Sequence, residues 1–353
     1  MEKEQRVEWI DVAKGLGLLF VIIGHTMTTP IRGASHVAHG IYTAIYFFHM
    51  PFMFYLSGRT FGLSMNKYEQ QKNGVILAKK SKQLLLPYVV YGAMVYFVFF
   101  IANQISSLGR ILEGAGYGKQ PISQWIYGVI IGDNLYAYHL WYIYGLFFMT
   151  IVSYFLCKYC KYRKTLMFGV GILCLVARIY VDTTYWGILN LVMKCYVWFV
   201  VGAFVDFSKY VRKIWSLVWQ VLSLGYLFVI AMNLNDCNQN SGALAYEALK
   251  WIADVGLLML CINVAMLQNK VVKKVFSYTG RNSFGIYLFH QPFFASGGGL
   301  VLYKVLGLPL VLAIVLTFGM CYVCPILLLK LLDQKYFENL KPFLLGTTRK
   351  KRG

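Results

Sequence analysis

Residues 307–329 read GLPLVLAIVLTFGMCYVCPILLL and contain no charged side chain. About 20 consecutive apolar residues are enough to cross the hydrocarbon core of a bilayer as a helix. Similar stretches recur along the whole chain, at residues 10–29, 41–64, 83–104, 137–157, 165–181, 186–206, 214–233, 248–268 and 284–302. The sequence therefore predicts an all-α fold, a polytopic integral membrane bundle of about ten transmembrane helices.

The overall composition agrees with this interpretation. The chain has 353 residues, of which 58% are hydrophobic and only 14% are charged, and its mean hydropathy is +0.57. These values are too apolar for a soluble globular protein. Because no long Pro/Gly/Ser-rich linker divides the chain, we expect one domain, residues 1–353.

The formal net charge of +20 is explained by membrane orientation rather than by nucleic-acid binding. Most basic residues lie in alternate connections between the apolar stretches, and isolated charges such as Arg32, Arg110, Lys119 and Lys250 are assigned to the others. The basic segments are Lys3 and Arg6, then residues 67–82, 158–164, 209–213, 270–281 and 330–352. Since Lys and Arg gather on the cytoplasmic side, we expect both termini in the cytoplasm and a multi-pass protein of the inner or plasma membrane.

The eight cysteines are not expected to hold a metal ion. The pairs Cys157/Cys160 and Cys321/Cys324 have no further ligands nearby that would complete a zinc tetrahedron. Small apolar packing is the role that we predict for them.

The first apolar stretch carries charges that are costly inside a membrane. It reads WIDVAKGLG over residues 9–17 and later contains Gly24-His25. Lys14 and His25 are eleven residues apart, which on a helix is about three turns plus roughly 20°, with a rise of about 16 Å. Both side chains therefore share one face, and Gly15 and Gly17 leave room for a ligand or another helix.

The second stretch, FHMPFMFYLSGR over residues 48–59, runs in the opposite direction. This places Arg59 near the depth of Lys14, and His49 near the depth of His25. Ionisable side chains at such depths normally face the interior of a bundle and mark a functional site. The alternatives are an interfacial Asp11–Lys14 ion pair and, for His25 and His49, ordinary hydrogen bonds between helices.

The connection over residues 105–136 combines glycines with Trp125, Tyr127 and Tyr136. This composition suits a sugar-binding loop, and it is equally typical of the aromatic belt at a membrane interface. The belt is the favoured interpretation.

These motifs resemble the acyltransferase-3 superfamily, and within it the branch of fucose 4-O-acetylase-like proteins. The resemblance covers nearly the whole chain, and the motifs occur in the family's order. They are Asp11 and Lys14 ahead of Gly24-His25, FHMPFMFYLSG at 48–58, KKSK at 79–82 before LLLPY, HLWY at 139–142, and GRNSFGIYLFHQP at 280–292. Lys14, Lys79 and Lys82 stand where many members have Arg, so these positions would bind phosphate as point charges rather than through a planar fork.

The resemblance implies transfer of an acyl group, usually acetyl, from a cytoplasmic thioester to an acceptor outside the cytoplasm. Many members modify surface polysaccharides, and some carry an additional soluble domain that assists transfer. We therefore expect acetyl-CoA as the donor substrate, no metal, and a cell-envelope sugar or lipid-linked glycan precursor as the acceptor. A longer donor such as succinyl-CoA stays open. The lipid bilayer is a further partner, and a homodimer is compatible with the sequence.

The predicted catalytic residues are His25, Asp11 and His49. His25 is expected to take the proton of the acceptor hydroxyl, and Asp11 to orient Lys14. A donor to the developing oxyanion is expected from His49, Ser57 or a nearby tyrosine. A covalent acyl-histidine route is the alternative. Donor binding is assigned to Lys14, Arg59, Lys79, Lys82 and Ser57.

A second function class is a non-enzymatic carrier, either a flippase for a glycolipid or a transporter of a small anion. In such a protein the same cations would bind substrate while the helices rock. Acyl transfer requires an indispensable base, whereas a carrier requires alternating access to one site.

Overall fold

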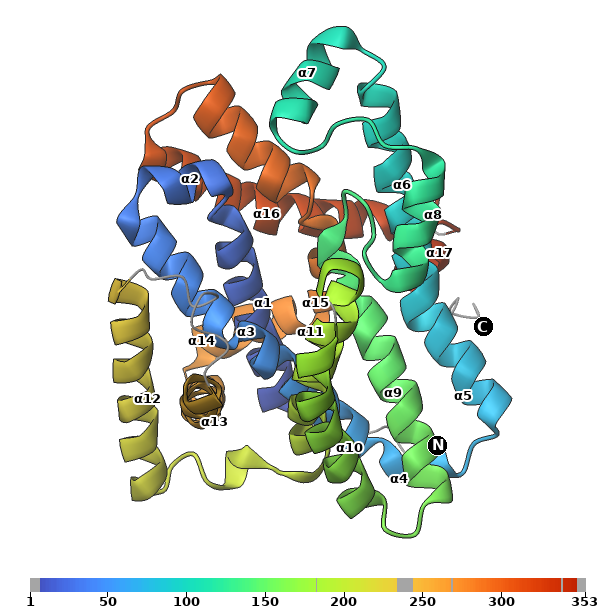
Figure 1. Cartoon of the computed structure of the whole chain (residues 1–353), viewed down its shortest axis with the longest axis vertical. Helices are drawn as coiled ribbons and strands as arrows, with labels where there is room; N and C mark the ends of the chain where they lie inside the picture. Colours follow the sequence, from blue (N-terminus) through green and yellow to red (C-terminus); the bar gives the residue numbers. More distant parts are fainter. Residues whose placement is uncertain (1–6, 182, 234–243, 268, 338, 348–353) are drawn as a thin grey trace. The chain divides into compact units, whose positions relative to one another are not determined.

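The computed structural model describes residues 7–181, 183–233, 244–267, 269–337 and 339–347. Within these ranges the chain forms helices and no β-strand (Figure 1), so the all-α prediction is confirmed. The chain divides into two compact units, Met1–Leu56 with Val205–Ile326, and Ser57–Phe204 with Leu327–Gly353. The single domain expected from the sequence stays a prediction.

Among the described residues, seven helices are long and apolar enough to cross a membrane. They are Glu8–Thr26, Asn73–Ala102, Tyr138–Tyr159, Trp186–Phe204, Ile214–Met232, Ala248–Ala265 and Leu310–Leu332. Each overlaps one of the ten predicted spans, although the helix Asn73–Ala102 begins ten residues before the predicted span at 83–104. The chain is therefore a multi-pass membrane protein.

The other three predicted spans take different forms. The span at 41–64 falls on α3 (His36–Leu63), a continuous helix of 28 residues that ends one residue before the predicted boundary. The span at 165–181 is the shorter α10 (Arg163–Ala177), which ends in one 3-10 turn, η3 (Arg178–Tyr180). The span at 284–302 is broken into several short pieces.

The break follows α15 (Ser283–Phe289), and the chain continues in two π-helical segments, η5 (Phe293–Gly297) and η6 (Leu300–Val305). Pro292 has no N–H group to extend the hydrogen-bond ladder of α15. His290 lies at this interruption. Apolar composition alone does not reveal such a break.

In the first unit, α1 (Glu8–Thr26) packs against α13 (Leu244–Ala265), α14 (Lys270–Arg281) and α15. Its approach to α14 is very close, because Gly15 and Gly280 both lack a side chain at the crossing. A Cβ atom on Gly15 would collide with the carbonyl oxygen of Phe276, and one on Gly280 with the carbonyl oxygen of Asp11. Small residues are what permit backbones to meet in this way.

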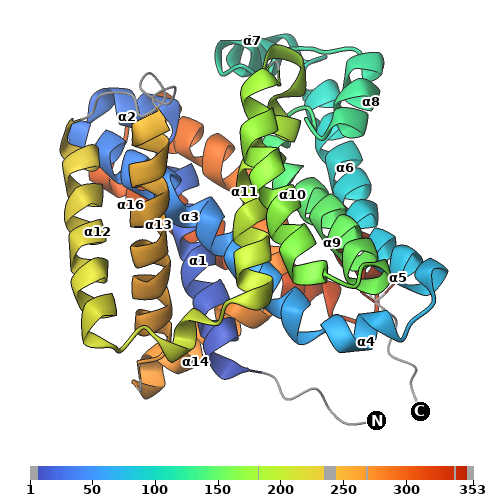
Figure 2. The ribbon, with the colours of Figure 1, turned by 60° about the horizontal axis from the view of Figure 1, so that its bottom comes forward.

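This unit also contains α12 (Ile214–Asn233) and a buried charged pair on α13. α12 lies beside α13 (Figure 2). Two charged residues of α13, Lys250 and Asp254, are both buried. This corrects one expectation from the sequence, since Lys250 was expected in an outward-facing connection.

In the second unit, the end of α3 packs on α11 (Thr183–Phe204). Gly58 and Gly62 allow this contact, since Cβ atoms there would collide with the carbonyl oxygens of Phe199 and Ala203. The spacing of four residues between the glycines is the small-residue pattern of membrane helix pairs. α11 also lies beside α10 and α9 (Trp141–Tyr159) (Figure 2).

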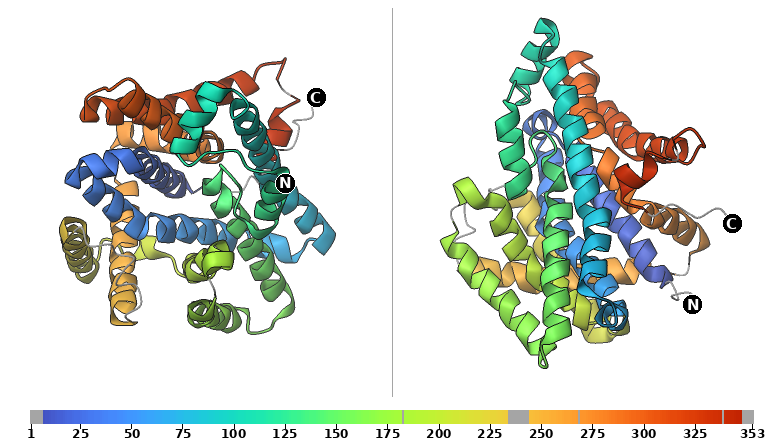
Figure 3. Two further views of the ribbon diagram at one scale, coloured as in Figure 1. Left: turned by 45° about the horizontal axis from the view of Figure 1, so that its top comes forward. Right: turned by 90° about the vertical axis from the view of Figure 1, so that its right-hand side faces the viewer.

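A long helical column in the same unit carries two of the predicted donor-binding lysines. It is formed by α5 (Asn73–Lys80), the π-helical segment η1 (Ser81–Leu85) and α6 (Leu86–Ala102), and it is drawn in light blue to cyan in the right-hand view of Figure 3.

The remaining elements of the two units are α2 (Thr29–Ala34), α4 (Met65–Glu69), α7 (Ser106–Gly114), α8 (Ile122–Ile131), η2 (Tyr138–Leu140), η4 (Phe207–Lys209), α16 (Leu310–Leu332) and α17 (Lys341–Leu345).

Aromatic side chains of the 105–136 connection pack on one another. Phe99 of α6 stacks on Tyr117 and on Tyr136, with ring centroids 5.0 Å apart in both pairs. The Tyr136 hydroxyl donates a hydrogen bond to the Gly118 carbonyl at 2.5 Å. These rings therefore stabilise the connection itself, while the belt and sugar-binding interpretations both stay predictions.

Candidate active site

Three imidazoles and one phenol gather in the first unit. His25 lies in the last turn of α1, Tyr46 and His49 lie on α3, and His290 stands at the break after α15. The Nδ1 atom of His25 lies 3.3 Å from the Tyr46 hydroxyl oxygen, and the His25 and His290 ring centroids are 5.2 Å apart. Tyr46 also contacts His49, at 4.8 Å between centroids. We call these four residues the imidazole–phenol cluster.

The local sequence explains how α1 and α3 bring these groups together. Gly24 precedes His25, and a Cβ atom there would stand 3.0 Å from the Tyr46 ring and 3.1 Å from the Ile45 side chain. The missing side chain lets α3 come close to the last turn of α1. Tyr46 and His49 are three residues apart, so they share a face of α3.

Two of the imidazoles have a defined tautomer. His49 Nδ1 lies 2.7 Å from the Ile45 carbonyl oxygen, and His290 Nδ1 lies 2.6 Å from the Tyr287 carbonyl oxygen. Because a carbonyl only accepts hydrogen bonds, Nδ1 carries the proton in both rings. The Nε2 atom of each neutral ring therefore keeps a lone pair.

His25 differs, because its partner is a hydroxyl that donates or accepts. When Nδ1–H of His25 donates to Tyr46, Nε2 is the basic nitrogen and the phenol proton is available to another acceptor. His25 is half-buried, and 38% of Tyr46 is exposed. Both residues therefore have accessible surface, unlike the fully buried His290.

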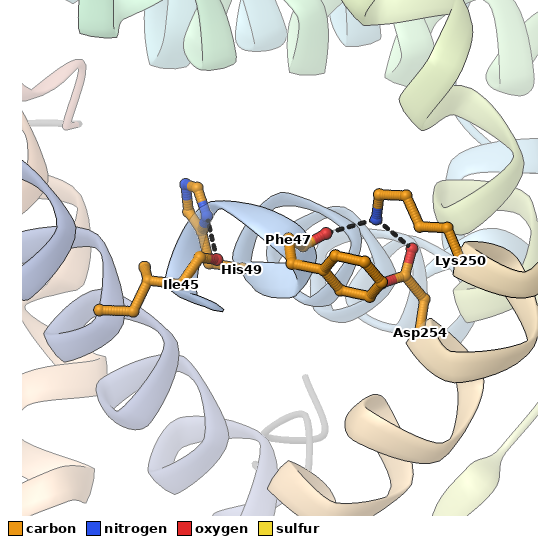
Figure 4. A network of polar contacts seen from close by, with 5 residues as sticks. All are labelled: Ile45, Phe47, His49, Lys250 and Asp254. Carbon is orange, nitrogen blue, oxygen red and sulfur yellow. Dashed lines mark hydrogen bonds and ion pairs between the residues drawn. The ribbon is translucent and has the colours of Figure 1, made fainter. Parts of the chain in front are cut away.

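A buried ion pair adjoins the cluster on α3. Lys250 Nζ lies 2.8 Å from Asp254 Oδ2 and also donates to the carbonyl oxygen of Phe47, two residues before His49 (Figure 4). Lys250 and Asp254 are one helical turn apart on α13, at the i,i+4 spacing that favours ion pairs.

Asp11 and Lys14 lie near the start of α1, Asp11 buried and Lys14 half-buried. Since α1 is unbroken from Glu8 to Thr26, the helical spacing between Lys14 and His25 holds. The two glycines that follow Lys14 serve helix packing, because a Cβ on Gly17 would lie 2.7 Å from Met53 Sδ. Of the two alternatives for these glycines, the structure supports the approach of a helix.

The remaining predicted donor-binding residues belong to the second unit. Ser57 Oγ is 2.8 Å from the Tyr142 hydroxyl, which gives both groups a hydrogen-bond partner. Lys79 lies in the last turn of α5 and Lys82 in η1, and both side chains are exposed. Arg59 is half-buried on α3. Of the predicted set, the cluster thus brings together His25 and His49.

A family model described as an acyltransferase domain matches residues 7–329, which is nearly the whole chain. The chain belongs to the acyltransferase-3 family. It is therefore a membrane acyltransferase, and the carrier interpretation is not favoured. No curated protein and no solved structure matches it.

The cluster contains groups of the kinds that acyl transfer uses: an imidazole that can act as a base, and a hydroxyl that can donate a hydrogen bond. Across the residues that the structure describes, no group of three or more His, Cys, Asp or Glu side chains could hold a metal ion.

Several residues in or beside this candidate site were not predicted from the sequence. His290 lies inside the quoted block 280–292, but its position at a helix break was not visible. Nothing in the sequence around Tyr46 indicated a functional role, except that Tyr46 lies three residues before His49. Lys250 and Asp254 form an i,i+4 pair of opposite charge inside an apolar stretch, and that pattern is a signal that could have found them.

Proposed function

We propose that this acyltransferase moves an acetyl group from cytoplasmic acetyl-CoA to a hydroxyl of a cell-envelope sugar or lipid-linked glycan precursor, in the inner or plasma membrane. The observation that supports it most is the contact between His25 and Tyr46, a base paired with a hydroxyl donor on membrane helices. The resemblance to fucose 4-O-acetylase-like proteins, which stays a prediction, supports a sugar acceptor.

In the proposed reaction, Nε2 of His25 takes the proton from the acceptor hydroxyl as its oxygen attacks the thioester carbonyl. The C–O bond forms and the C–S bond then breaks. The departing CoA thiolate takes the proton back from the imidazolium, so no net proton is gained or lost. While His25 is charged, its Nδ1–H donates to Tyr46, which stabilises the imidazolium.

The oxyanion of the tetrahedral intermediate needs a hydrogen-bond donor. His49 is one candidate, but its Nδ1–H is bonded to the Ile45 carbonyl. A neutral His49 has no second N–H, so it would donate through Nε2 only as an imidazolium. Tyr46 is better suited, because a phenol whose oxygen accepts from His25 can donate its own proton to a second acceptor. Ser57, the third candidate, is hydrogen-bonded to Tyr142.

Donor phosphates are assigned to four cations, Lys14, Arg59, Lys79 and Lys82, with Ser57 as a neutral contact. Lys79 and Lys82 flank the start of η1, and π-helical turns are frequent at functional sites. The proposed role of Asp11 is to orient Lys14. We expect acetyl-CoA, the bilayer and the glycan acceptor as partners, and neither a nucleic acid nor a metal takes part in the proposed reaction. A homodimer stays a prediction.

The direct test uses the full chain in lipid nanodiscs with radiolabelled acetyl-CoA and lipid-linked glycans extracted from the native envelope. Label should move to the glycan and should be released by mild alkali, as expected for an ester. Succinyl-CoA in a parallel reaction reports donor choice, and a burst of label on the protein would indicate an acyl-histidine route. If neither thioester labels a glycan, the proposal is rejected.

An independent test compares envelope glycans of a deletion strain with those of the parent by mass spectrometry. The deletion strain should lack one acetyl group on a specific glycan, and a plasmid copy should restore it. Identical glycan masses in the two strains would contradict the proposed acceptor class.

A further inference from the structure

α3 continues through Pro51 without a break. In an α-helix each N–H donates to the carbonyl four residues earlier, and a proline has no N–H to give. The carbonyl deprived of its donor is that of Phe47. A buried carbonyl without a hydrogen bond is costly, particularly where no water is present to replace the donor.

Another helix supplies the missing donor. The ammonium group of Lys250 on α13 donates to the Phe47 carbonyl oxygen and lies 4.0 Å from the centre of the Phe47 ring (Figure 4). Asp254 accepts from the same ammonium group at 2.8 Å and compensates its charge. Only 9% of Lys250 and 1% of Asp254 are exposed, so the pair is shielded from solvent and has a fixed geometry.

The Phe47 carbonyl belongs to the turn that carries two members of the imidazole–phenol cluster. Tyr46 precedes Phe47, and His49 follows it by two residues. The His49 ring is oriented by a second carbonyl of this turn, that of Ile45. A change in how the turn is held would therefore alter both the direction of the Tyr46 phenol and the hydrogen bond that defines the His49 tautomer.

We propose that Lys250 and Asp254 are a positioning pair: the Lys250 ammonium replaces the helix hydrogen bond that Pro51 removes, and thereby fixes the α3 turn that holds Tyr46 and His49 beside His25. The contact between Lys250 and the Phe47 carbonyl does not depend on the reaction, but the effect of the pair on catalysis rests on the function proposed above. In this role Lys250 and Asp254 act on the cluster through the backbone of α3.

The test is a cycle of four proteins. The pair is neutralised in Lys250→Met/Asp254→Asn, since removing Lys250 alone would leave Asp254 as a buried unpaired charge. Pro51→Ala restores an N–H at position 51, so the Phe47 carbonyl regains its helix donor. The four proteins are wild type, the neutralised pair, Pro51→Ala, and the combination. Lys341→Met/Asp333→Asn is the matched control, because it neutralises an ion pair that is partly exposed.

With Pro51 present, neutralising the pair should lower kcat by roughly ten- to a hundredfold, with a much smaller change in KM for acetyl-CoA, because misplacement of reacting groups affects the chemical step. In the Pro51→Ala background, the same neutralisation should lower kcat by less than about threefold. The control should resemble wild type. Equal losses in the two backgrounds, or an unchanged kcat in the neutralised pair, would overturn the proposal. The neutralised pair could also fail to insert in the membrane when residue 51 is proline. If it inserts normally when residue 51 is alanine, that result supports the proposal.

A measurement independent of activity separates this inference from the proposed function. In protein labelled with ¹⁵N-histidine, the NMR chemical shifts of the His49 ring nitrogens report whether the proton is on Nδ1. The His49 signals are assigned as those that disappear in the His49→Gln variant. Neutralising the pair should mix the tautomers when residue 51 is proline and leave them unmixed when it is alanine. That pattern would support the positioning pair even if wild type transferred no acetyl group, and unchanged His49 shifts in both backgrounds would reject it.

Discussion

Tyr46 brings its hydroxyl oxygen to 3.3 Å from His25 Nδ1 and its ring to 4.8 Å from the ring of His49. One phenol thus joins the histidine of α1 to the histidine of α3. With 38% of its surface exposed, Tyr46 is the most exposed member of the cluster, whereas His49 and His290 are buried.

Replacing Tyr46 with phenylalanine keeps the ring and removes the hydroxyl. We expect kcat for acetyl transfer to fall by about 10² to 10³, the usual cost of losing an oxyanion donor, with little change in thermal stability. Tyr42→Phe is the matched control, because Tyr42 stacks on Tyr46 at 4.0 Å and would keep that stacking. Equal activity of the two variants would remove Tyr46 from the mechanism.

His25→Ala tests the general base directly. Loss of such a base costs about 10² to 10⁴ in rate, whereas loss of one interhelical hydrogen bond costs about 0.6 kcal/mol and would leave transfer largely intact. His36→Ala, at the start of α3, should behave as wild type. If His25→Ala, matched for expression and melting temperature, keeps more than roughly a tenth of the rate, His25 is a packing residue.

The two lysines at the junction of α5 and η1 test donor binding. Lys79→Ala combined with Lys82→Ala should mainly raise KM for acetyl-CoA, because lost phosphate contacts weaken binding more than chemistry. Arginine at both positions should be tolerated, since many family members have it there. Lys80→Ala is the internal control, because Lys80 belongs to the same basic run but its ammonium group lies over the Tyr68 ring, 5.0 Å from the ring centre. Unchanged KM in the double alanine variant would reject the assignment.

The α1–α14 crossing should not accept a methyl group. In Gly15→Ala the new Cβ meets backbone atoms of α14 that have little freedom to move, and such overpacking typically costs about 1–3 kcal/mol in the free energy of unfolding. Gly169→Ala in α10 is the control, since a Cβ there has open space and alanine favours a helix by about 1 kcal/mol. Melting temperatures in detergent should move in opposite directions, and a stable Gly15→Ala protein would contradict the close crossing.

The predicted orientation rests on the alternation of basic connections. Reporter fusions near Lys72, near Lys161 and after the C-terminus should indicate cytoplasm, and those near Gly116 and Asn238 should indicate the opposite side. Asn238 and residues 348–353 lie outside the described residues, so these fusions test the sequence argument alone. Inverted signals at any two positions would refute it.

Much of the fold could be predicted because a membrane imposes a simple rule. A segment such as 307–329 has no stable place except across a bilayer or inside a large core, and its length decides between them. The same rule does not reveal helix continuity: Pro292 interrupts the helix within 284–302, and within 165–181 the α10 helix changes to a 3-10 turn after Ala177. Hydropathy reports how readily the side chains leave water, whereas the continuity of a helix depends on its backbone hydrogen bonds.

By itself, the sequence determined the fold class, the family motifs and the helix face shared by Lys14 and His25, since each depends on residues close together in the chain. Only the tertiary structure decided that Tyr46 and His290 stand beside His25, and that Lys250 donates to the Phe47 carbonyl about 200 residues away in sequence. Such contacts join separate helices. They depend on which faces pack together. Pro51 marks the Phe47 carbonyl as lacking its helix donor, but the sequence does not show that Lys250 supplies one.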